Sequence, residues 1–134
     1  MPEREIIFED LTKPQDKYRL KDYLRELYRL TDKRHITLDF SATPEIDCDQ
    51  AESFDITMTS SITGVTIKNE FKGRVITLIF IQGGSGSYTV AFTTTVKRTA
   101  AAFVPTATVG AASIISFLYD GTVWREISRA LDVR

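Results

Sequence analysis

The chain has 134 residues, of which 43% are hydrophobic, with 17 basic and 18 acidic side chains. This length and hydrophobic content fit one globular domain with a buried core and argue against two domains. The formal net charge of −1 excludes the strongly basic balance of a protein whose whole surface binds nucleic acid. Cys48 is the lone cysteine, which excludes an intramolecular disulfide and a disulfide-stapled secreted scaffold.

The start of the chain and its apolar runs indicate whether a signal peptide or a membrane-spanning segment is expected. Charged residues begin at Glu3, where a signal peptide would soon turn apolar. The most apolar run, Val75 to Ile81, is too short to span a bilayer. We therefore expect a soluble protein that is made in the cytoplasm and has no signal peptide and no membrane partner.

The composition changes near His35. Residues 1 to 34 hold 17 of the 35 charged side chains, whereas the rest of the chain holds 15 of the 17 threonines. We therefore predict two parts, an N-terminal helical segment for attachment or assembly over residues 1–34 and a β module over residues 35–134.

Residues 14 to 33 are predicted to form an amphipathic helix. Pro14 suits the first helical turn, and the apolar positions fall within an arc of about 120° at about 100° per residue. A helix of this length is marginal alone in water, so its apolar face is expected to bury against the β module, other copies or a partner. The apolar residues that we assign to assembly or attachment are Leu20, Tyr23, Leu24, Leu27 and Leu30.

A basic stripe lies on the other side of this predicted helix. Asp22 and Glu26 partly neutralise it by pairing three residues along the helix. We interpret the stripe as a solvated face or a docking surface and expect no nucleic-acid partner. Its members, spaced every four residues, are Lys17, Lys21, Arg25, Arg29 and Lys33.

After His35 the hydrophobic pattern has a period of two. This alternation predicts short strands over His35–Phe40, around Phe54–Met58 and around Val65–Ile67. Polar turn residues separate these segments and bound each predicted strand.

Two longer strands are predicted in the centre of the chain. Arg74–Gln82 is nearly continuous apolar sequence, which is typical of a strand covered on both faces. Gly83–Ser87 is interpreted as a hairpin loop that leads into an alternating strand over Tyr88–Phe92. The loop lacks the Lys-Ser/Thr ending of a phosphate-binding loop and is followed by a strand rather than a helix.

The final hairpin is the clearest local signal. Ser113–Tyr119 and Thr122–Ile127 flank Asp120-Gly121, a pair that suits the positive φ values of a type I′ turn. About eight short strands with turns between them predict a mainly β fold, a jelly-roll-like β-sandwich with an N-terminal amphipathic α-helix.

Several of these segments together form a recognisable series. The run Gly73–Phe92 is followed in order by Val96-Lys97, Val104–Thr106 and Ser116–Trp124. This series resembles the β module of tailed-bacteriophage virion surface proteins, as found in tail fibres, tail tips and capsid decorations. The resemblance covers about residues 35 to 130, and its motifs are structural ones, turns and core alternation.

The resemblance implies a trimeric β surface module without catalysis. On that basis we expect a homotrimer in the virion, made in the host cytoplasm, bound to other virion proteins of capsid or tail, with no cofactor and no metal. A host surface glycan is the alternative partner, recognised through the loops of the module. The residues that we assign to such a receptor or partner contact are Ser85, Phe103, Tyr119 and Trp124. For Tyr119 and Trp124, the aromatic residues of the last hairpin, core or subunit-interface packing is the preferred interpretation, beside this contact role.

Catalytic candidates are few. His35 is the only histidine, and it starts a strand without a nucleophile motif such as G-x-S-x-G. Cys48 has no recognisable context that would lower its pKa. We therefore expect no catalytic residue.

An acidic cluster follows the first predicted strand. It lacks the glycine and the terminal glutamate of an EF-hand loop, and we interpret it as a solvated acidic edge that discourages aggregation. A cation site and a small polysaccharide hydrolase built on paired carboxylates are the alternatives. The cluster consists of Glu45, Asp47, Asp49 and Glu52.

Overall fold

The computed structural model describes residues 21–24, 35–98 and 102–134. The chain divides into two units, Met1–Lys33 and Arg34–Arg134, and each is described by itself. In the first unit, Lys21 to Leu24 are helical. The rest of the helix predicted over residues 14–33 lies outside the described residues, so that helix remains a prediction.

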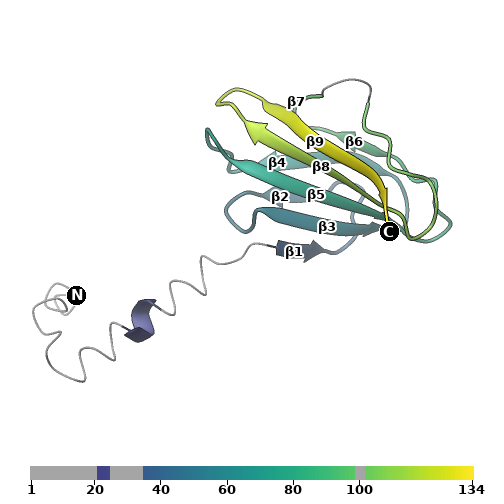
Figure 1. Ribbon diagram of the computed structural model, residues 1–134, viewed down its shortest axis with the longest axis horizontal. Helices are drawn as coiled ribbons and strands as arrows, with labels where there is room; N and C mark the ends of the chain where they lie inside the picture. The colour runs from purple at the N-terminus through teal and green to yellow at the C-terminus, as the bar shows by residue number, and fades with distance from the viewer. Residues whose placement is uncertain (1–20, 25–34, 99–101) are drawn as a thin grey trace, which may run out of the picture. The chain divides into compact units, whose positions relative to one another are not determined.

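The described part of the second unit contains nine strands in two sheets (Figure 1). The larger sheet has six strands in the order β1-β3-β5-β8-β9-β7, and the smaller has three in the order β2-β4-β6. The mainly β prediction is therefore confirmed. The strands are β1 (His35–Leu38), β2 (Glu45–Asp47), β3 (Ser53–Met58), β4 (Ile62–Lys68), β5 (Val75–Gln82), β6 (Val90–Phe92), β7 (Val96–Lys97), β8 (Ala112–Tyr119) and β9 (Trp124–Val133).

The first six strands alternate between the two sheets. β1, β3 and β5 are parallel neighbours in the larger sheet, and β2, β4 and β6 are parallel neighbours in the smaller one. Each passage from one sheet to the other and back is one coil, so these strands form three coils of a β-solenoid. The jelly-roll-like prediction is wrong, because a jelly roll pairs antiparallel strands and each strand here pairs with the second one along the chain.

The last strands extend the larger sheet beyond the coils. β8 is antiparallel to both β5 and β9, and the two-residue β7 is parallel to β9. The larger sheet therefore ends in β1 at one edge and in β7 at the other.

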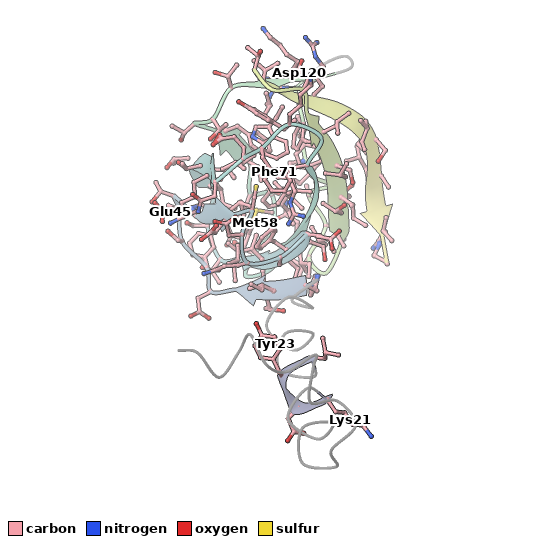
Figure 2. All side chains as sticks on the ribbon, turned by 90° about the vertical axis from the view of Figure 1, so that its left-hand side faces the viewer. Lys21, Tyr23, Glu45, Met58, Phe71 and Asp120 are labelled. Carbon is pink, nitrogen blue, oxygen red and sulfur yellow. The ribbon has the colours of Figure 1, made fainter. Side chains whose placement is uncertain are left out.

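The core lies between the two sheets. Alternate residues of the long strands are buried there, and Figure 2 shows Met58 among the side chains that the sheets enclose. Three ring pairs have centroid distances of 5.1–5.7 Å. Phe92–Phe117 links the two sheets, Phe80–Phe103 links β5 to the loop after β7, and Tyr119–Trp124 lies within the larger sheet. Such contacts add to the hydrophobic free energy of the buried rings.

The segment Gly83–Ser87 is a corner between sheets and not the predicted hairpin loop, because β5 and β6 belong to different sheets. Gln82, which is 1% exposed, explains the change of direction. Its side-chain amide donates to the Tyr88 carbonyl at 2.9 Å, and its Oε1 accepts from the Tyr88 N–H at 3.1 Å. Gly83 is needed because a Cβ there would lie 2.6 Å from the Met58 carbonyl oxygen.

The predicted hairpin between β8 and β9 is confirmed, but its turn type is wrong. Tyr119 pairs with Trp124, so the loop has four residues, and only Gly121 has a positive φ, of 100°. The Asp120 carboxylate accepts from the backbone N–H groups of Thr122 and Val123 at 2.8 and 2.9 Å. These bonds, with one from Arg125, lower the pKa of Asp120 to about 2. A side-chain acceptor thus replaces the second positive φ of a type I′ turn.

Replacing the buried amide should destabilise the fold. In Gln82→Ala the N–H and C=O groups of Tyr88 lose their partners inside the protein, and an unsatisfied buried polar group costs about 1–3 kcal/mol. We expect the free energy of unfolding to fall by about 2–4 kcal/mol. Urea denaturation followed by circular dichroism measures this. Gln50→Ala, at an exposed turn position, is the matched control, and an equal effect of both substitutions would contradict the role given to Gln82.

Candidate functional site

The largest feature without a role in the core is the surface of the six-stranded sheet that points away from it. We call this surface the outer face. Figure 1 looks onto this sheet, and no described element lies in front of its strands. Strand register arranges its side chains in rows that cross the sheet.

Three of these rows are mainly aliphatic. Val75 lies beside Leu118, and both Val75 (40% exposed) and Val133 (43% exposed) are open to solvent. Because soluble monomers rarely expose contiguous apolar patches, such a surface indicates an interaction site. The aliphatic residues of the outer face are Val75, Ile79, Ile81, Ala112, Ile114, Leu118, Ala130 and Val133.

One row between them is polar. Thr77 Oγ1 and Ser116 Oγ form a hydrogen bond of 2.9 Å between β5 and β8. Ser128 continues this row on β9, and Ser53 and His35 continue it on β3 and β1. A line of hydroxyl groups therefore lies between aliphatic rows, and these rows themselves continue into Asp55 and Thr37 on β3 and β1 and into Arg125 on β9.

The smaller sheet has a different outward surface. Its solvent-facing positions include Thr63, Lys68, Glu45 and Ala91, which are all exposed. Lys68 and Glu45 form an ion pair of 3.3 Å there. The solvent-facing side of this sheet therefore lacks the aliphatic rows that the central strands β5 and β8 give to the six-stranded sheet.

At the β1 edge of the outer face, Ser53, His35 and Asp55 lie together. His35 Nδ1 is 2.7 Å from Ser53 Oγ, and His35 Nε2 is 2.6 Å from Asp55 Oδ1. Asp55 Oδ1 also accepts from the Thr37 hydroxyl at 2.7 Å. With Nε2–H donating to the carboxylate, Nδ1 is the acceptor for the serine hydroxyl, which is the hydrogen-bond order of a catalytic triad.

Two features oppose catalysis at this cluster. β3 is hydrogen-bonded on both sides, to β1 and to β5, so its N–H groups serve the sheet and not an oxyanion hole. The side chains also stand on a flat, exposed sheet surface, whereas substrate sites are concave. A cavity between the sheets, beside Leu38, Pro44 and Ile46, has a volume of ≈ 10 Å³, which is room for about one water molecule.

Sequence reasoning missed this cluster. His35 and Ser53 are 18 residues apart, and only the parallel register of β1 on β3 brings them together. The available signal was the alternation itself, with His35 and Thr37 in one strand and Ser53 and Asp55 in another, but it does not reveal which strands are neighbours.

The predicted attachment residues are described only in part. Tyr23 is 56% exposed and Leu24 is 44% exposed. Leu20, Leu27 and Leu30 lie outside the described residues. The predicted apolar face of the helix therefore stays a prediction at those three positions.

The predicted receptor contacts do not form one surface. Phe103 and Trp124 are buried in the core, and Tyr119 is half-buried against Trp124. Ser85 is exposed, and its N–H donates to the Tyr88 hydroxyl at 3.2 Å. Two of the three predicted aromatic contact residues, Phe103 and Trp124, are therefore part of the core, which agrees with the core packing preferred for Trp124.

Cys48 and the acidic cluster are held by local contacts. Burial raises the pKa of the Cys48 thiol to about 11, so the thiol is protonated at neutral pH. Asp47 accepts from the Asn69 side chain at 2.7 Å, which with the Asp49 N–H lowers the pKa of Asp47. Within residues 21–24, 35–98 and 102–134, no three His, Cys, Asp or Glu side chains are placed to hold a metal ion.

Comparisons of the chain with protein-family models, curated proteins and solved structures gave no match. Among the described residues, no helix has the length and apolar character needed to cross a membrane.

The Ser53–His35–Asp55 cluster is open to a direct test. We expect the full chain to hydrolyse p-nitrophenyl acetate no faster than its Ser53→Ala variant, because no oxyanion hole accompanies the serine. Release of p-nitrophenol measures the rate. A rate that is lost in Ser53→Ala and kept in the exposed control Ser60→Ala would contradict this expectation.

Proposed function

We propose that this chain is a non-catalytic structural subunit of a virion surface, which assembles as a homotrimer through the outer face and attaches through its predicted N-terminal helix. The aliphatic outer face is the observation that carries the proposal. The virion setting and the number of three subunits rest on the resemblance of residues 35 to 130 to phage surface modules.

The composition of the outer face supports assembly. Its middle is aliphatic apart from the hydrogen-bonded Thr77–Ser116 pair, with Ile79 beside Ile114 on the two central strands. Its margins are polar, with His35 on β1 and Lys97 on β7. An apolar centre inside a polar rim is the usual anatomy of a protein interface.

The predicted coverage of β5 also supports assembly. Nearly continuous apolar sequence over residues 75–81 is typical of a strand covered on both faces. The core covers one face, where Ile76, Leu78 and Phe80 are buried. A second copy on the other face would complete the coverage that the sequence predicts.

The rival functions have less support. Glycan recognition through the loops would use Phe103 and Trp124, whose rings are buried. Polysaccharide hydrolysis by the acidic cluster would need a carboxyl whose pKa is raised, whereas the pKa of Asp47 is lowered and Glu45 pairs with Lys68.

Charge on the outer face should break the assembly. We expect Ile79→Asp or Ile114→Asp to raise the dissociation constant at least about 100-fold, because each aliphatic side chain contributes about 1.5–3 kcal/mol when buried and a charge adds a desolvation cost. Light scattering measures the mass, and circular dichroism checks the strands. Ala91→Asp, on the exposed surface of the smaller sheet, is the control. A mass that stays at three chains in Ile79→Asp and Ile114→Asp would refute this interface.

Charge on the predicted helix tests the attachment role. Leu24→Asp combined with Leu27→Asp should abolish assembly or incorporation into virus particles, because the apolar face that must be buried would carry two charges. The β strands should remain, as seen by circular dichroism. Lys21→Asp, on the predicted polar side, is the control. Unchanged mass together with unchanged incorporation would remove the helix from the proposal.

A further inference from the structure

The charges of the second unit are unequally distributed along the six-stranded sheet. Residues 34–58, up to the end of β3, contain six acidic side chains and one arginine, Arg34, a charge of −5. Residues 59–134 contain eight Lys or Arg and four acidic side chains, a charge of +4. Glu45, Asp47 and Lys68 lie on the smaller sheet. On the six-stranded sheet itself, β3 carries Asp55 near one end of the strand order and β7 carries Lys97 at the other end.

Most charges with a close opposite neighbour already form pairs. Glu70 and Lys72, which are exposed on the turn between β4 and β5, lie two residues apart and have opposite signs. The ion pairs are Asp120–Arg125 at 2.5 Å, Glu126–Arg129 at 2.7 Å, Asp132–Arg134 at 2.6 Å and Glu45–Lys68 at 3.3 Å.

Outside these pairs remain Asp39, Glu70 and Lys72 and two further groups of exposed charges. We call Asp49 and Glu52, on the turn before β3, the acidic flank, and Lys97 and Arg98, at the end of β7, the basic flank. The flanks cannot meet within one copy, because β3 and β7 are four strands apart, about 19 Å at about 4.8 Å per strand. This distance exceeds the screening length of about 8 Å at physiological salt.

The two flanks nevertheless lie at the same height along the strands. The strand registers show this: Lys97 lies opposite Arg125, Arg125 lies opposite Leu118, and Leu118 lies opposite Val75. Val75 is two residues before Thr77, and Thr77 is level with Ser53. Glu52 is therefore level with the basic flank to within about one residue.

From this arrangement we infer that copies of the chain meet head to tail around their outer faces, with the acidic flank of each copy against the basic flank of the next. The inference rests on the proposed homotrimer and specifies how its subunits are oriented. The occupant of each flank is a second copy, because the second copy carries the complementary charges at the matching height.

In a head-to-tail contact the two subunits use different surfaces, so the contact is heterologous. When the rotation from one subunit to the next returns to the first subunit, the assembly is a closed ring. With an axis along the strands, each outer face turns toward the axis and each flank meets the opposite flank of its neighbour. The apolar rows then supply most of the binding free energy, and the flanks select the orientation of the subunits.

Charge reversal on each flank provides the test. The acidic-flank variant is Asp49→Lys with Glu52→Lys, and the basic-flank variant is Lys97→Glu with Arg98→Glu. Each should raise the dissociation constant of the trimer at least about tenfold, because like charges then face each other in every contact. The chain that carries all four substitutions should return to the wild-type mass, since the charges are again complementary. Light scattering of the full chain over a dilution series measures all of these masses.

A mixture of the two double variants makes the test specific for a ring. One variant has two basic flanks and the other has two acidic flanks, so an alternating ring of three subunits cannot close and a 1:1 dimer is expected. Asp39→Lys is the control, because Asp39 follows β1 at the other end of the strands.

The outcomes separate this inference from the proposed function. A trimer that resists both reversals, or a four-substitution chain that stays dissociated while folded, would overturn the head-to-tail orientation and leave the trimer standing. A wild-type chain that is monomeric over the whole dilution series would overturn the trimer and with it this inference.

Discussion

The parallel pairing of β1, β3 and β5 is the constraint on which the other features depend. Because each strand pairs with the second one along the chain, each coil places Phe54 over Leu78 and Ile56 over Phe80 on the inside. The same register places Ser53 over Thr77 and Asp55 over Ile79 on the outside. Like residues therefore stack in rows across the sheet, and both the core and the outer face result from a single register.

The two faces of the six-stranded sheet differ in what covers them. The inner side is closed within the chain by the smaller sheet and by the loop that carries Phe103. The outer side repeats the aliphatic pattern without a cover among the described residues, and the hydroxyl row through Thr77 and Ser116 interrupts it. In a proposed interface this row would give the contact a fixed position, since an unmatched hydroxyl loses its hydrogen-bond partners when it is buried.

The sequence was sufficient to predict seven of the nine strands, but it missed β2 and β7, ended the last strand at Ile127 instead of Val133, and did not reveal which strands are neighbours. A period of two, as in Phe54–Met58, shows which residues of a strand share a face, and it is identical in a jelly roll and in a solenoid. Gly83–Ser87 was therefore interpreted as a hairpin loop, whereas β5 and β6 belong to different sheets and the hydrogen bonds of Gln82 to the Tyr88 backbone hold the chain in a corner. The outer face was indicated by the apolar run of β5, whereas the contact of His35 with Ser53 depends on the register between distant strands.

The edge strands of the larger sheet influence whether the proposed subunits would form a closed ring or an open filament. An exposed edge strand can pair with the edge of another copy and extend the sheet without limit. β7 has only two residues, so a ladder from β1 of one copy to β7 of the next would contain few hydrogen bonds. The acidic and basic flanks of neighbouring copies are therefore better paired in the proposed ring around the outer faces than in an edge-to-edge extension of the sheet. In the ring, the aliphatic rows also become buried. A short terminal strand thus favours the closed assembly over the open one.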